Sequence, residues 1–232
     1  MPDHSDVVII GGGHNGLVCA FYLASAGLKV TVLERRGVVG GAAVTEEFHP
    51  GFRNSTASYT VSLLNPKVIA DMDLAGHGLR IVHRRVSNFL PLNERDYLIV
   101  GEGRTKAEVA KFSNRDAERL DAYGERLEAI ADVVRDLVLK TPPNIEMGGG
   151  LASLGELLKV AALGRSLSRL ETTARRDLLA LFAQSAGDWL DGWFESDPIK
   201  AAFGFDGIVG TYASPYSPGT AYVLLHHVFG EV

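Results

Sequence analysis

The sequence predicts an α/β fold, in which a strand–helix–strand unit comes first and a mixed sheet and a helical region follow. Val7 to Ile10 are four β-branched apolar residues, a run typical of a parallel strand covered on both faces. A glycine-rich turn and an apolar helix-forming segment, Leu17 to Ala26, come next. Gly27 then stands where a left-handed helix stop is favoured, and Lys29 to Leu33 form a second strand-like run.

The glycine turn has the spacing of a Rossmann-like unit that binds a dinucleotide. Gly11 allows a tight bend, Gly13 lets the backbone approach a pyrophosphate, and Gly16 lets the helix pack close to the strand. The start of the helix offers a diphosphate unpaired N–H groups and a favourable dipole. In a chain with 26 glycines among 232 residues this spacing is a weak signal by itself. The flanking strand and helix therefore carry the prediction.

Glu34 ends the second predicted strand, at the distance from the glycines where a carboxylate meets a ribose. A carboxylate accepts hydrogen bonds from ribose hydroxyls and repels a 2′-phosphate, which argues against NADP. Arg35 and Arg36 follow, and we expect them beside the adenine edge or in solvent. The alternative is a polar strand end with no role in ligand binding.

A second glycine pair, Gly40 and Gly41, favours FAD over a nicotinamide cofactor. In flavoproteins this turn passes close under the diphosphate, where a Cβ would collide, and a flexible loop is the alternative. Together these features nominate eleven cofactor-binding residues. They are Gly11, Gly12, Gly13, Asn15, Gly16, Leu17, Glu34, Arg35, Gly40, Gly41 and Ala42.

The segments Gly11 to Phe52, Thr56 to Tyr59, Asp191 to Ala201 and Ser214 to Val228 resemble the phytoene desaturase and carotenoid ketolase-like branch of the flavin amine-oxidase superfamily. The resemblance covers essentially the whole chain, and its last two segments are more specific than the glycine pattern. It implies an FAD-dependent oxidoreductase with a flavin-binding domain and an inserted substrate domain. Many members carry an arginine directly after the second glycine pair, where this chain has Ala42, so a phosphate contact by that arginine is not expected here.

The same resemblance leads us to expect two domains. Residues 1–78 form the N-terminal part of the FAD-binding domain, and residues 79–232 form an incomplete substrate or cap domain with a β-hairpin followed by helices. Family members are longer, and their C-terminal portion completes the flavin site. We therefore expect this chain to be the N-terminal half of a longer protein.

Composition and charge exclude some functions. A net charge of −5 and an isoelectric point near 5.8 give no electrostatic footprint for nucleic acid. The apolar runs are shorter than the roughly 18 residues of a membrane-spanning helix, although peripheral membrane contact and a protein partner stay open. The acidic start MPDHSD fits neither a secretory signal nor a transit peptide and favours the cytoplasm, with the mitochondrial matrix as the alternative in a eukaryote. The single cysteine, Cys19, excludes an intramolecular dithiol relay, and we expect it to be buried.

The later segments predict a hairpin and several helices. Leu79 to Val100 alternate loosely around an NERD turn, which predicts the hairpin. Ser113 with Asp116 resembles a capping box, Thr141-Pro142-Pro143 ends the helix that follows, and a glycine cluster at 148–150 precedes the next one. The apolar stripe of the first helix is Leu120, Tyr123, Leu127, Ile130, Val134 and Leu137. Further helices are expected at 151–170, 175–194 and 198–209, the last capped by Asp197.

No catalytic residue follows from the sequence, because the flavin ring itself accepts the hydride. The aromatic residues between Trp189 and Phe205 either line a tunnel for an apolar substrate or simply pack the core. His49, Arg53 and Tyr59 lie where the chain approaches the flavin, with surface roles as the alternative. Adjacent His226 and His227 do not suggest a metal site.

Three functional hypotheses follow from these patterns. The first is hydride transfer from an apolar or unsaturated, carotenoid-like substrate to FAD. The second is an FAD-binding regulatory protein with little turnover that acts through a protein partner. The third is an NAD-dependent dehydrogenase.

Overall fold

The computed structural model describes residues 4–58, 60–144, 151–226 and 228–230. The chain divides into two compact units, residues 1–81 with 230–232 (unit 1) and residues 82–229 (unit 2). The boundary between the units lies three residues after the one expected from the sequence. The roles expected of the two parts, cofactor binding and substrate binding, stay predictions.

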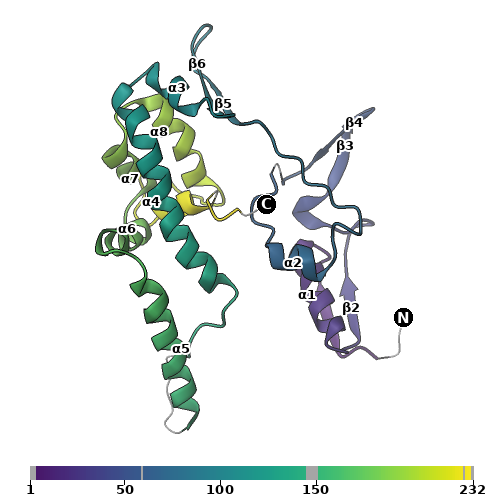
Figure 1. Cartoon of the computed structure of the whole chain (residues 1–232). Coiled ribbons are helices and arrows are strands. Elements are labelled where there is room, and N and C mark those ends of the chain that lie inside the picture. Colours follow the sequence, from purple (N-terminus) through teal and green to yellow (C-terminus); the bar gives the residue numbers. More distant parts are fainter. Residues whose placement is uncertain (1–3, 59, 145–150, 227, 231–232) are drawn as a thin grey trace. The chain divides into compact units, whose positions relative to one another are not determined.

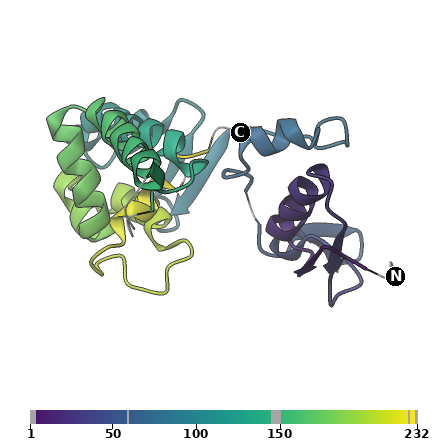
Figure 2. The ribbon, with the colours of Figure 1, turned by 90° about the horizontal axis from the view of Figure 1, so that it is seen from below.

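Unit 1 begins with the predicted strand–helix–strand unit. Strands β1 (Val7–Ile10) and β2 (Val30–Leu33) pair in parallel, and helix α1 (His14–Ser25) connects them. Figures 1 and 2 show α1 beside this pair of strands. Helix α1 starts three residues before the expected position, because Gly13 already has extended backbone angles and serves as its N-cap. Gly27, with φ +89°, follows the helix end as predicted.

The apolar residues of β1 are not covered on both faces within the described part of the chain. Val8 is 54% exposed and Ile10 is 89% exposed, whereas Val7 and Ile9 are half-buried. The reason is that β1 pairs only with β2, and α1 covers only one face of a two-stranded sheet. The two-sided burial expected from the apolar run is therefore wrong for this chain.

The rest of unit 1 is a short 3₁₀ turn, a hairpin and a short helix. The turn η1 (Gly41–Ala43) leads into β3 (Thr45–His49), which pairs antiparallel with β4 (Phe52–Ser55). Helix α2 (Pro66–Asp71) begins after Asn65, whose side chain accepts a hydrogen bond from the Lys67 N–H at 2.9 Å.

Unit 2 begins with the expected hairpin. Strands β5 (Val86–Pro91) and β6 (Tyr97–Gly101) pair antiparallel. The side chain of Asn93 accepts hydrogen bonds from the N–H groups of Arg95 and Asp96 at 2.8 and 2.9 Å, which closes the NERD turn. Helices α3 (Thr105–Ala110) and α4 (Asn114–Val138) follow. The apolar stripe predicted for α4 faces the main hydrophobic core, where Tyr123, Leu127 and Ile130 are buried.

The predicted capping box at the start of α4 is only half formed. Ser113 Oγ accepts a hydrogen bond from the Asp116 N–H at 3.1 Å, as an N-cap should. The Asp116 carboxylate does not reach back to Ser113. It accepts hydrogen bonds from the N–H groups of Glu195 and Ser196 at 2.9 and 2.8 Å and from the Ser196 hydroxyl at 2.5 Å. A distant segment has therefore replaced the local partner.

The remaining helices differ from the sequence expectation in two places. They are α5 (Leu151–Ser168), α6 (Thr172–Ala183), α7 (Ala186–Trp193) and α8 (Asp197–Gly204), followed by the 3₁₀ turns η2 (Asp206–Ile208) and η3 (Ala221–Leu225). The single helix expected over 175–194 is broken, because the Ser185 hydroxyl caps α7 by accepting from the Asp188 N–H at 3.0 Å. The N-cap of α8 is Ser196 and not Asp197.

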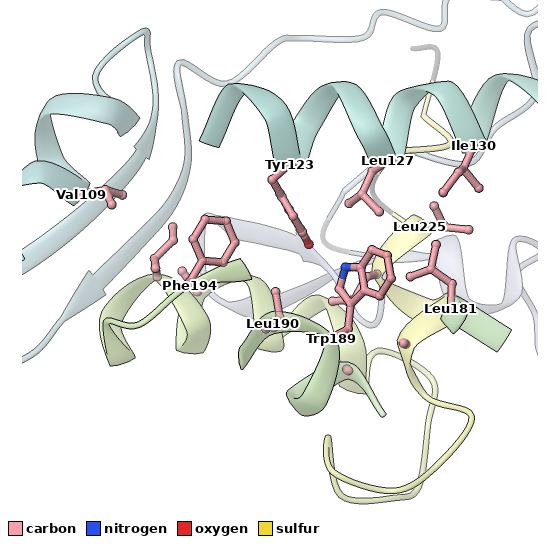
Figure 3. Close-up of a cluster of buried hydrophobic side chains, with 14 of the residues drawn as sticks. Val109, Tyr123, Leu127, Ile130, Leu181, Trp189, Leu190, Phe194 and Leu225 are labelled. Atoms are coloured by element: carbon pink, nitrogen blue, oxygen red, sulfur yellow. The ribbon is translucent and has the colours of Figure 1, made fainter. Parts of the chain in front are cut away.

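Tyr123 is a central ring of the core of unit 2 (Figure 3). Its ring stacks on Phe203 with centroids 5.3 Å apart and meets Phe194 and Trp193 edge-on at 5.0 and 5.5 Å. Four of the five aromatic residues noted in the sequence pack in or against this core, whereas Phe205 is 50% exposed. The glycine cluster at 148–150 lies outside the described residues.

Candidate dinucleotide site

The turn between β1 and α1 has room for glycine only. Gly11 has φ +102°, and its N–H donates to the Leu33 carbonyl at 2.7 Å, which ties the turn to β2. A Cβ at Gly16 would lie 2.3 Å from the Gly11 carbonyl oxygen, so α1 packs directly against the turn. The first-turn N–H groups of α1 have no side-chain cap at Gly13 and no acidic residue beside them. They therefore form a site suited to an anion.

Glu34 lies at this helix start. Its Oε2 accepts a hydrogen bond from the Gly12 N–H at 2.7 Å, and its Oε1 accepts one from the Arg36 N–H at 2.9 Å. These two bonds, that from Arg36 first, hold the pKa of the Glu34 carboxyl below its usual range. A carboxylate has about four lone-pair positions, so two stay available for ribose hydroxyls.

The second glycine pair touches the first turn. The Gly40 N–H donates to the Gly12 carbonyl at 2.7 Å, and Gly13 and Gly40 form a parallel β-bridge. Gly41 has φ +58°, and a Cβ on it would lie 2.8 Å from Gly13 Cα. The close approach expected at this pair is therefore an approach of one backbone to another, beside the start of α1.

The structure thus brings most of the nominated residues to one place. Gly11, Gly12, Gly13, Gly16, Glu34, Gly40 and Gly41 are linked by the contacts described above. Asn15 is exposed on the first turn of α1, and Leu17 is half-buried one turn on. Arg35 is exposed just after Glu34, and Ala42 is exposed in η1.

Some neighbours of the site were not nominated from the sequence. Val44 is buried directly under Gly40, with Cγ2 3.0 Å from the position of an added Cβ, and Val39 Cγ1 lies equally close to Gly12. Both flank the glycine pair in sequence, and this adjacency was the available signal. Arg36, expected beside adenine or in solvent, forms an ion pair with Glu46 on β3.

The other polar residues noted in the sequence are not gathered at this site by any contact among the described residues. The His49 ring packs edge-on against Phe52 at 5.6 Å, and Arg53 is exposed on β4. Tyr59 and His227 lie outside the described residues. In the part of the chain that the structure describes, no three His, Cys, Asp or Glu residues gather as a metal site. Cys19 is exposed on α1, so its expected burial is wrong.

The chain matches the family described as FAD dependent oxidoreductase over residues 6–192. It is 37% identical over 242 residues to pyridine nucleotide-disulfide oxidoreductase domain-containing protein 2 of Rattus norvegicus, an alignment covering 98% of this chain and 41% of the rat protein. It is 42% identical over 117 residues to a limonene dehydrogenase of Castellaniella defragrans, covering 49% of this chain and 21% of that protein.

Among solved structures the chain resembles putrescine oxidase bound to putrescine, with a TM-score of 0.54 and 18% identity over 98% of this chain and 44% of that one. This likeness shows the fold: an α/β Rossmann-like arrangement shared with FAD oxidases. The chain spans about two fifths of the length of the curated relatives that match nearly all of it, 41% for the rat protein. None of the helices in the described ranges is both long and apolar enough to cross a membrane.

Proposed function

Since this chain belongs to the FAD-dependent oxidoreductase family, we propose that residues 1–78 hold the diphosphate and adenosine ribose of FAD, in a protein that transfers a hydride from an apolar or unsaturated substrate to the flavin. The observation that carries the proposal is the convergence of both glycine turns and Glu34 at the start of α1. FAD is the cofactor of this family.

Each part of the site has a stated role. The first-turn N–H groups of α1 bind the paired phosphates, because they lack partners within the helix and carry its positive dipole end. The two remaining acceptor positions of Glu34 take the ribose hydroxyls. Gly41 keeps the second turn close to Gly13 without a side chain in the path of the diphosphate. Residues 79–232 contribute to the substrate domain.

When bound, the flavin supplies the acceptor for the hydride, and the protein supplies position and a dry environment. An apolar substrate class is supported by the name of a relative, limonene dehydrogenase, and by the apolar core of unit 2. No described side chain is assigned a catalytic role.

Cofactor titration tests the first half of the proposal. Flavin fluorescence is followed as the 232-residue chain is added to FAD, and NADH is titrated in the same way. We expect FAD to bind more tightly than NADH. Tighter binding of NADH would overturn the interpretation of Gly40 and Gly41 and favour a nicotinamide-dependent dehydrogenase.

Flavin reduction tests the second half. The complete gene product, loaded with FAD, is mixed without oxygen with limonene or a longer unsaturated isoprenoid, and the absorbance of the oxidised flavin is followed. Bleaching by an apolar donor supports the proposal. Flavin that stays bound but is reduced by none of these donors, together with a stable partner in pull-down, would instead favour the regulatory alternative.

A further inference from the structure

Unit 2 contains a small cavity that the cofactor site does not use. It has a volume of about 240 Å³ and lies among residues of β5, β6, α4, α8, η2 and the segment around η3. Its apolar lining comes from five of these segments. The residues are Val100, Leu127, Phe203, Leu224 and Val228. All of the lining residues belong to unit 2, so the cavity does not depend on how the two units are placed.

The polar groups of the cavity are few and lie on different elements. They come from Ser87 and Asn88 on β5, Tyr123 on α4 and Asp206 in η2. Tyr123 is only 6% exposed, and Figure 3 shows its hydroxyl directed away from α4 into the interior of the unit. Among the described residues this hydroxyl has no hydrogen-bond partner, since the contacts of Tyr123 are those of its ring and an electrostatic interaction with Asp206.

A buried hydroxyl without a partner is costly, and buried polar groups nearly always have one. Water is a poor candidate to fill this cavity, because a buried water needs two to four polar partners and most of the lining is apolar. A cavity of about 150 Å³ holds benzene, so one of this size has room for about ten non-hydrogen atoms. A small organic molecule that accepts one hydrogen bond matches both the volume and the lining.

We propose that this cavity is a binding site for a small neutral, largely apolar molecule whose single accepting oxygen, of a ketone or an alcohol, takes a hydrogen bond from the Tyr123 hydroxyl. The apolar residues remove the carbon skeleton from water, and the stacked rings of Tyr123 and Phe203 form one wall. The choice of an apolar substrate class rests on the proposed function, whereas the site itself does not.

Two titratable groups at the cavity are consistent with a neutral ligand. Burial raises the pKa of Asp206 to about 7, so its carboxyl is largely uncharged in mildly acidic solution. Burial, and then the nearby Asp206, raise the pKa of the Tyr123 hydroxyl well above its usual value. The phenol therefore stays protonated and able to donate across the physiological pH range.

Three probes of one skeleton test the ligand class: 1-tetralone, with a ketone oxygen; tetralin, the hydrocarbon; and 1-aminotetralin, a cation at neutral pH. Binding to the 232-residue chain is measured by calorimetry or ligand-observed NMR, without FAD and again with FAD. We expect 1-tetralone to bind about fivefold more tightly than tetralin, the worth of one neutral hydrogen bond. Equal binding of these two, or no binding of 1-tetralone, overturns the proposal. Tightest binding of 1-aminotetralin overturns the neutral class.

Tyr123→Phe removes only the hydroxyl. Because the hydroxyl makes no hydrogen bond with the described residues, the variant should be as stable as the parent chain while losing the fivefold preference for 1-tetralone. The matched control is Tyr222→Phe, at a tyrosine that is 48% exposed and stacked on Phe182, and it should keep the preference. A second variant, Val100→Phe, fills the cavity and should abolish binding of both probes.

These outcomes separate the inference from the proposed function. A chain that binds FAD but discriminates none of the probes refutes the cavity and leaves the cofactor assignment standing. A chain that selects 1-tetralone through Tyr123 but binds no FAD refutes the cofactor assignment and leaves the cavity standing.

Discussion

Replacing Gly41 by alanine tests the close approach of the two glycine turns. Gly41 has φ +58°, and the added Cβ would lie 2.8 Å from Gly13 Cα. Two costs follow. The left-handed conformation costs an alanine about 1–2 kcal/mol, and overlap with backbone atoms adds about 1–3 kcal/mol, as in overpacked interiors.

Gly27→Ala is the matched control. Gly27 also has a positive φ, +89°, but a Cβ there would meet no atom within 4 Å. It should therefore show the conformational cost alone. The difference between the two variants, about 1–3 kcal/mol, measures the close approach. If FAD binds only the unshifted turn, that difference corresponds to a roughly 5- to 150-fold loss of FAD affinity for Gly41→Ala relative to Gly27→Ala.

Two measurements check this prediction. Amide hydrogen exchange of the β1 and α1 peptides reports the stability of unit 1 separately from unit 2, and fluorescence titration reports FAD affinity. Equal exchange protection and equal FAD affinity in the two variants would refute the reasoning, because the contact between Gly41 and Gly13 would then have no energetic consequence.

Three further predictions concern carboxyl groups. Glu34→Ala should weaken the binding of FAD but not of FMN, which lacks the adenosine ribose that Glu34 is proposed to bind; parallel titrations with the two flavins check this, and an equal loss for both contradicts that role. Asp116→Ala should destabilise unit 2 by about 3 kcal/mol or more in urea unfolding, since it leaves three donors from Glu195 and Ser196 unpaired; a loss under about 1 kcal/mol counts against the network. The folded pKa of Asp206, about 7, lies above its ordinary value of 3.8, so its contribution to stability is present below about pH 4 and is lost as the pH rises through 7. Asp206→Asn should flatten the pH dependence of stability between these values, whereas Asp197→Asn, at a side chain that is 95% exposed, should leave it unchanged.

Local spacing was sufficient to predict the nucleotide-binding unit. The glycines, the helix and Glu34 lie within a short stretch of chain, and their conformations follow from backbone sterics and from hydrogen bonds between near neighbours. The hairpin at Asn93 and the apolar stripe of α4 were predictable for the same reason. The presence of both glycine turns also predicted that they would meet.

Long-range partners decided what the sequence could not. Asp116 bonds to Ser196, 80 residues away, so neither the incomplete capping box nor the change of N-cap from Asp197 to Ser196 follows from local pattern. The break before α7 had a local signal in Ser185 and Asp188, but the apolar residues around it also fit one continuous helix.

The exposure of β1 and the cavity beside Tyr123 are further consequences of tertiary structure. A run of apolar residues predicts that a strand can be buried, but the elements that pack against it determine which face is covered. Likewise, the stripe of α4 predicted that Tyr123 faces the core, and only the packing of α8, η2 and the hairpin around it left its hydroxyl next to a cavity. The sequence by itself determined which segments form helices, strands and the nucleotide-binding turn, because those depend on neighbouring residues. The tertiary structure decided which polar atoms find partners, because the partners come from segments far apart in the chain.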